Sequence, residues 1–246
     1  MKKMMVIVLL VLAGCVTTGP TVSKAKMAEG YYEQGLSYLQ QKNLELASVE
    51  FNRSIQTDSS YKQSYYGLGI ISDFQGNLDH AAEYYKKAID QDENFSEAYN
   101  ALGVVYFKQK KWKEADKAFH KALANKLYTT PHIPYINLGD LYMAQKDYPK
   151  AIEAYRDSIQ FVKLELTIQK LGTAFLEAGR VKEAVSEFQE GVGISPQNAS
   201  MRFSLAVALL KDGNKKSALA EFKKAADLAP KSEVARQAND YIKTLR

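Results

Sequence analysis

Residues 96–129, SEAYNALGVVYFKQKKWKEADKAFHKALANKLYT, decide the fold of this chain, because their pattern of small and aromatic residues recurs along its length. A small residue returns at steps of 34, 34, 36, 33 and 34 residues, at Gly35, Gly69, Gly103, Gly139, Gly172 and Ala206. Each of these is followed twelve residues later by Ala and sixteen residues later by Phe or Tyr. This period is typical of stacked helix pairs that hold another molecule, and it argues against an active site.

The repeating unit is similar to the tetratricopeptide repeat, in which two antiparallel helices form one unit. The pattern predicts an all-α fold, a right-handed superhelical solenoid of six tetratricopeptide helix pairs plus a C-terminal capping helix. Only small side chains are expected where the two helices of a pair cross, and the aromatics are expected to fill the wedges between helices. Ser232 is a predicted N-cap of the last helix. The repeat domain, residues 28–246, is expected to comprise repeats at 28–61, 62–95, 96–129, 132–164, 165–198 and 199–232 and a cap at 233–246.

The start of the chain predicts a lipoprotein leader. A cationic start precedes an apolar run of nine residues at 4–12, which is too short to span a bilayer, and Leu12-Ala13-Gly14-Cys15 follows. This segment resembles the bacterial lipobox, in which the chain is cut before the cysteine and the sulfur receives diacylglycerol. We expect a removed signal peptide at 1–14, a Cys15 that carries diacylglycerol and an N-acyl chain such as palmitate, and a flexible tether at 15–27. The alternative is an ordinary secretory signal with an incidental cysteine.

Location and charge follow from the same region. Val16 stands where an aspartate would favour retention in the inner membrane, so we expect an outer-membrane protein, anchored through its lipid and facing the periplasm. Removal of Lys2 and Lys3 with the leader would lower the formal charge from +5 to +3. This weak charge is scattered among acidic residues, which argues against a nucleic-acid partner.

Catalytic chemistry finds little support in the sequence. His80, His120 and His132 are widely separated, and the sequence contains no HExxH motif, no cysteine pair and no glycine-rich phosphate loop. We therefore expect a protein that is not an enzyme, with no metal, no small-molecule substrate and no cofactor apart from the covalent lipid on Cys15.

The first helices of the repeats are expected to line a concave face. A groove for an acidic peptide tail would present Lys, Arg and Asn there, to pair with carboxylates. Here the positions carry mostly aromatic and aliphatic residues: Tyr32, Leu36, Leu39, Tyr66, Ile70, Phe74, Val104, Phe107, Ile136 and Met143. These residues predict a ligand with an apolar face, such as an amphipathic helix or a β-strand segment. The alternative is that neighbouring repeats bury individual members of the set.

One step of the repeat is two residues longer than the others, between Gly103 and Gly139. Two prolines and a threonine pair lie in the additional sequence, which predicts a rigid elbow at 127–134 between the third and fourth repeats. The elbow can be a tolerated loop insertion or a contact point for a partner.

Three features together resemble the type IV pilus pilotins, the PilF-, PilW- and Tgl-like lipoproteins. They are the lipobox, Tyr-x-x-Gly-Leu-x-Tyr-Leu-Gln at 32–40, and Ala-Asn-Lys-Leu-Tyr at 124–128 followed by a proline and by Asn-Leu-Gly at 137–139. The resemblance implies a protein that escorts secretin subunits to the outer membrane and helps them to multimerise. It also implies binding mainly by an apolar groove in the first repeats, at Tyr32, Leu36, Leu39, Tyr66, Ile70 and Phe74. The alternative function is an envelope scaffold for peptidoglycan enzymes or another periplasmic complex, which would use the convex face or the elbow.

Overall fold

The computed structural model describes residues 23–245, and within this range it contains thirteen α-helices and no strand. The predicted all-α class is confirmed. The leader, Cys15 and most of the tether lie outside the described residues. The helices are α1 (Lys24–Gln40), α2 (Leu44–Thr57), α3 (Lys62–Phe74), α4 (Leu78–Gln91), α5 (Ser96–Lys108), α6 (Trp112–Ala124), α7 (His132–Ala144), α8 (Tyr148–Phe161), α9 (Glu165–Glu177), α10 (Val181–Ile194), α11 (Ala199–Lys211), α12 (Lys215–Leu228) and α13 (Glu233–Leu245).

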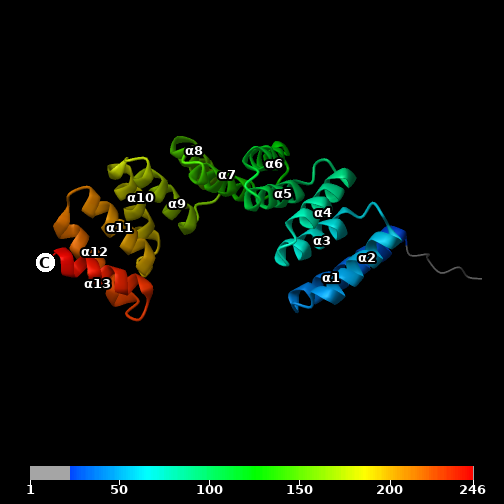
Figure 1. The fold of residues 1–246 in the computed structure, drawn as a ribbon, viewed down its shortest axis with the longest axis horizontal. Helices are drawn as coiled ribbons and strands as arrows, with labels where there is room; N and C mark the ends of the chain where they lie inside the picture. Colours follow the sequence, from blue (N-terminus) through cyan, green and yellow to red (C-terminus); the bar gives the residue numbers. More distant parts are fainter. Residues whose placement is uncertain (1–22, 246) are drawn as a thin grey trace, which may run out of the picture. The chain divides into compact units, whose positions relative to one another are not determined.

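The helices pack as successive pairs within two compact units (Figure 1). The first unit ends at Tyr61 and contains the pair α1 and α2. The second begins at Lys62 and contains the pairs from α3 to α12, each packed on the next, with α13 against α11 and α12. The first helix of each pair is called here an A helix and the second a B helix. The helix-A face is defined as the surface of α1 in the first unit, and of α3, α5, α7, α9, α11 and α13 in the second.

The two helices of each pair meet at the repeated glycine. A Cβ atom placed on Gly35 would lie 2.5 Å from Cε1 of Phe51, and one on Gly103 would lie equally close to Phe119. The same close approach joins Gly69, Gly139 and Gly172 to the aromatic residue sixteen positions further on. These rings are buried, as are the alanines twelve positions after each glycine. The predicted need for small residues at the helix crossings is thus confirmed, and it has a specific cause, an aromatic ring lying on the glycine.

Side-chain caps and tight turns set the helix ends. Asn198 Oδ1 accepts a hydrogen bond from Met201 N at 2.9 Å, and Asn43, Asp147 and Asn214 cap the starts of other helices in the same way. The predicted N-cap at Ser232 is confirmed, since its hydroxyl accepts from Ala235 N at 3.1 Å. The turn inside each pair of the second unit contains a residue of positive φ, which is Gly76, Lys110, Lys146, Gly179 or Gly213.

Two expected boundaries differ from the structure. The tether was predicted to reach residue 27, but α1 begins at Lys24, because Ser23 accepts a hydrogen bond from Lys26 N and caps the helix. The elbow was predicted to reach residue 134, but α7 begins at His132 and Pro134 lies buried in its first turn. Proline is tolerated there because the first-turn N–H groups have no partner within the helix.

The Gly35–Phe51 contact can be tested within one helix. We expect Gly35→Ala to lower the opening free energy of α1 by about 1–2 kcal/mol, since overpacking costs about 1–3 kcal/mol and exceeds the gain in helix propensity of about 1 kcal/mol. Amide hydrogen exchange of α1 measures this energy. The matched control is Gly30→Ala, five residues earlier on an exposed part of the same helix, where no atom lies within 4 Å of an added Cβ. This control should stabilise the helix, and equal effects of the two variants would refute the contact.

The turn lysines give a second prediction. Lys110 has a φ of 58°, a region that glycine adopts without a steric penalty. We expect Lys110→Gly to raise the free energy of unfolding by about 0.5–1 kcal/mol, because relief of backbone strain exceeds the added chain entropy of the unfolded state. Denaturant titration of the full chain measures the change. The reverse substitution Gly76→Lys, in the matching turn of the preceding repeat, should lower stability; a destabilising Lys110→Gly would contradict the strain argument.

Candidate functional site

The predicted binding residues of the first unit lie together on α1. Tyr32, Leu36 and Leu39 are each half-buried. The ring of Tyr32 lies 5.6 Å from the rings of both Phe51 and Tyr61, and burial raises the pKa of its hydroxyl. These side chains therefore contribute to the packing of the first unit while they keep part of their apolar surface exposed.

The predicted residues of the second unit also serve both the core and the surface. Tyr66 and Ile70 pack against the buried cluster that contains Tyr85 and Leu102, and the later members of the set pack against two further buried clusters. All except one are half-buried: Tyr66, Ile70, Val104, Phe107, Ile136 and Met143. The exception is Phe74, at the end of α3, which is 75% exposed. Most of these side chains are thus partly buried by their neighbours, and Phe74 is the least buried of them.

Polar groups on the helix-A face of the second unit pair with one another between successive A helices. Lys108 on α5 donates to both carboxylate oxygens of Asp73 on α3, at 2.6 and 2.8 Å. Asn137 on α7 donates to Asn100 on α5 at 2.8 Å. Lys108, and Lys170 on α9 in the same way, neutralise carboxylates of the protein itself. Both lysines are therefore poorly suited to bind an acidic peptide tail.

Asp140 is the centre of a similar arrangement between α7 and α9. Its Oδ1 accepts from Lys170 at 2.6 Å and from the hydroxyl of Tyr155 at 2.6 Å. Burial and the hydrogen bond to Asp140 raise the pKa of Tyr155, so its hydroxyl stays a donor. These residues border a surface hollow of about 320 Å³ whose lining also includes Met143, Leu166, Gln169 and Thr173. The hollow offers apolar contacts together with amide and hydroxyl groups that can bind a peptide backbone.

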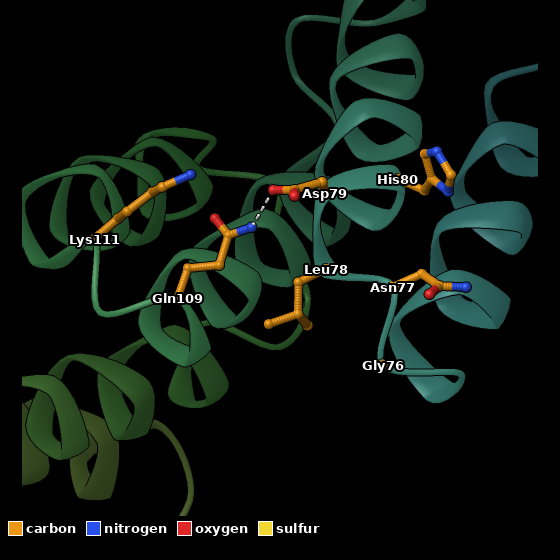
Figure 2. A pocket seen from close by; sticks show the side chains of 7 residues that line it. All are labelled: Gly76, Asn77, Leu78, Asp79, His80, Gln109 and Lys111. Atoms are coloured by element: carbon orange, nitrogen blue, oxygen red, sulfur yellow. Dashed lines mark hydrogen bonds between the residues drawn. The ribbon is translucent and has the colours of Figure 1, made fainter.

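A second hollow lies at the turn before α4 (Figure 2). It has a volume of about 600 Å³ and is lined by Gly76, Asn77, Leu78, Asp79, His80, Gln109 and Lys111. Gln109 Nε2 donates to Asp79 Oδ1 at 2.8 Å, and Figure 2 shows these two side chains pointing toward one another while His80 points away. The carboxylate is thus engaged by the protein, and none of the predicted binding residues lines this hollow.

The described residues hold no group of three or more His, Cys, Asp or Glu side chains that could bind a metal ion. Between residues 23 and 245, no helix is both long and apolar enough to cross a bilayer. The predicted lipid site, Cys15, lies outside this range.

The pairing across the helix-A face and the hollow at Asp140 were not predicted from the sequence. The sequence contains one usable signal, which is that Asp73 and Lys108 lie 35 residues apart, and Asp140 and Lys170 lie 30 apart. Separations close to the repeat period place opposite charges on neighbouring A helices, where they can form an ion pair.

Comparison with known proteins identifies the repeats. Models described as tetratricopeptide repeats match residues 28–61, 75–110, 95–163 and 170–233. The human intraflagellar transport protein 88 homolog is 27% identical over 100 residues, which are 38% of this chain and only 12% of that protein.

Two solved structures resemble the chain over nearly their whole length. PilF from Pseudomonas aeruginosa has a TM-score of 0.75 at 20% identity, covering 89% of this chain and 99% of PilF. PilW, described as a widely conserved type IV pilus biogenesis factor, has a TM-score of 0.76 at 18% identity, covering 87% of this chain and 99% of PilW. At these identities the likeness is one of fold. The chain is therefore a protein built of tetratricopeptide repeats, a class that binds protein partners.

Proposed function

We propose that this chain is an outer-membrane lipoprotein that binds secretin subunits through its helix-A face and promotes their localisation and multimerisation in type IV pilus assembly. The observation that carries the proposal is the likeness of fold to PilF and PilW, which spans 99% of each of those chains. The lipobox at Cys15 supports the location, since a lipid anchor together with a short tether would hold the repeats at the membrane surface.

The helix-A face supports an apolar partner segment. Its ion pairs join residues of the chain itself, as at Asp73 and Lys108, and the surface that remains for a partner includes half-buried aromatic and aliphatic side chains and the exposed ring of Phe74. An amphipathic helix or an unpaired strand of a secretin subunit would bury such a surface. Covering that helix or strand would keep the secretin subunits from aggregating before they multimerise.

A second candidate function is an envelope scaffold for peptidoglycan enzymes or another periplasmic complex. The observation that favours it is Leu127, in the elbow between α6 and α7, whose side chain is 88% exposed. A large apolar side chain held in solvent by a loop is a suitable contact for a partner. This mode of binding would not need the helix-A face.

Phe74 and Leu127 separate the two functions. We expect Phe74→Asp to weaken secretin capture at least about tenfold, because a carboxylate would have to be desolvated in an apolar contact. Leu127→Asp is the matched control, since both side chains are exposed and neither change disturbs the core. Secretin recovered in pull-downs from solubilised envelopes measures the effect. Loss of partners with Leu127→Asp alone would favour the scaffold function.

The lipid anchor gives a separate prediction. We expect Cys15→Ser to leave the protein unlipidated and the secretin mislocalised, because the thiol is the acceptor of the lipid. Membrane fractionation with heat-resistant secretin multimers as the readout tests this. The control is Thr18→Cys in the Cys15→Ser background, which restores a thiol but not the lipobox and leaves the Ser23 cap of α1 intact. Normal outer-membrane multimers in the Cys15→Ser strain would contradict the proposed escort role.

A further inference from the structure

A third hollow lies on the second unit between α11 and α13 and has a volume of about 600 Å³. This volume falls in the range of about 300–1,000 Å³ that is usual for ligand pockets. Its lining residues are Phe203, Val207, Arg236, Gln237, Asp240, Tyr241 and Thr244. None of them belongs to the predicted binding set, so the hollow is a separate feature of the helix-A face.

The rings of Phe203 and Tyr241 form the floor of this hollow, and both contact the buried ring of Phe222. The rings of Phe222 and Tyr241 stack with centroids 4.6 Å apart and an angle of 6° between their planes. Phe203 meets both of them edge to face, at 5.5 and 5.9 Å. Phe222 is fully buried and covers one face of Tyr241, whereas Tyr241 is 37% exposed. Because Tyr241 also lines the hollow, part of its side chain is open to a ligand there.

The charges at the rim pair with one another. Arg236 forms ion pairs with Glu233 and, at 3.5 Å, with Asp240, which also lies 3.7 Å from Lys243. Hydrogen bonds from Arg236 and Gln237 lower the pKa of Glu233 to about 2. Among the lining residues only Arg236 and Asp240 are charged, and their charges are opposite. The rim therefore complements an uncharged side chain.

We propose that this hollow is a second protein-binding site, which takes an uncharged aromatic side chain from a peptide segment of a partner protein. The ring stacks on Tyr241 as the third member of a column that begins at Phe222. The Gln237 amide donates to Glu233 and the Thr244 hydroxyl donates to the Tyr241 carbonyl, so the oxygens of both groups remain as acceptors for N–H groups of the neighbouring peptide backbone. The site is distinct from the proposed secretin-binding surface, because it is formed by other residues. It binds a single anchoring side chain, whereas the secretin-binding surface binds an extended apolar face of its partner.

Selection from a phage library of random peptides on the full chain tests this proposal. We expect enriched peptides to share a Phe, Tyr or Trp, and synthetic copies to bind Tyr241→Ala at least about tenfold more weakly. Tyr241→Phe keeps the ring and should retain binding. Tyr84→Ala, a tyrosine substitution on α4, is the matched control and should also bind normally. Enriched peptides without aromatics, no enrichment at all, or equal binding by Tyr241→Ala would each overturn the proposal.

Two further measurements test whether a loss of peptide binding comes from misfolding and whether a second copy of the chain occupies the hollow. Thr244→Trp should block the hollow without removing any ring from the floor, and its circular dichroism should match that of the unmodified chain. Undiminished peptide binding by this variant would contradict the site.

Sedimentation compares the self-association of the unmodified chain with that of Tyr241→Ala. Self-association lost only in the variant would show that a second copy occupies the hollow, which would overturn a site for a different partner. Phe74→Asp must leave peptide binding unchanged, so failure of the secretin proposal is distinguished from failure of this one.

Discussion

The contact between a glycine on the A helix and an aromatic ring on the B helix determines how close the two helices of a pair can lie. Glycine in a helix costs about 1 kcal/mol relative to alanine, whereas complete burial of an aromatic side chain contributes about 1.5–3 kcal/mol. Burial of the ring therefore outweighs the cost of the glycine wherever the ring is fully covered, as at Phe51, Phe119 and Phe188. In the sixth pair Ala206 replaces the glycine and is itself fully buried, so the last pair accommodates one Cβ atom at this position.

This packing determines which surface remains for a partner. The rings of the B helices and the alanines around them lie inside the pairs, so residues such as Tyr66 and Ile70 on the A helices contact the core with one side only. Their outer sides form the helix-A face. The ion pair of Lys108 with Asp73 and that of Lys170 with Asp140 join neighbouring A helices across this face. The charges are thus used within the protein, and the apolar surface is what distinguishes the face.

The repeat period was sufficient to predict the helix pairs, because glycine, alanine and the aromatic ring are each required by one short-range contact. The turns were harder to predict, since Lys110 and Lys146 have positive φ although lysine is not a typical residue for that conformation. Pro134 appeared to belong to the elbow, because proline ends helices more often than it occupies their first turn. The predicted binding residues are on the surface in part, but the exposure of Phe74 depends on where α3 ends, which the repeat pattern does not specify.

The hollow at α13 follows from where the row of A helices ends. Val207 on α11 and Tyr241 on α13 are 34 residues apart, so Tyr241 takes the place of an A-helix residue although no B helix follows it within the described residues. A capping helix need only bury its inner side, and Ala235, Ala238 and Ile242 do so. Tyr241 is exposed and stacks on Phe222, so it gives α13 an aromatic surface that the proposed peptide ring would cover.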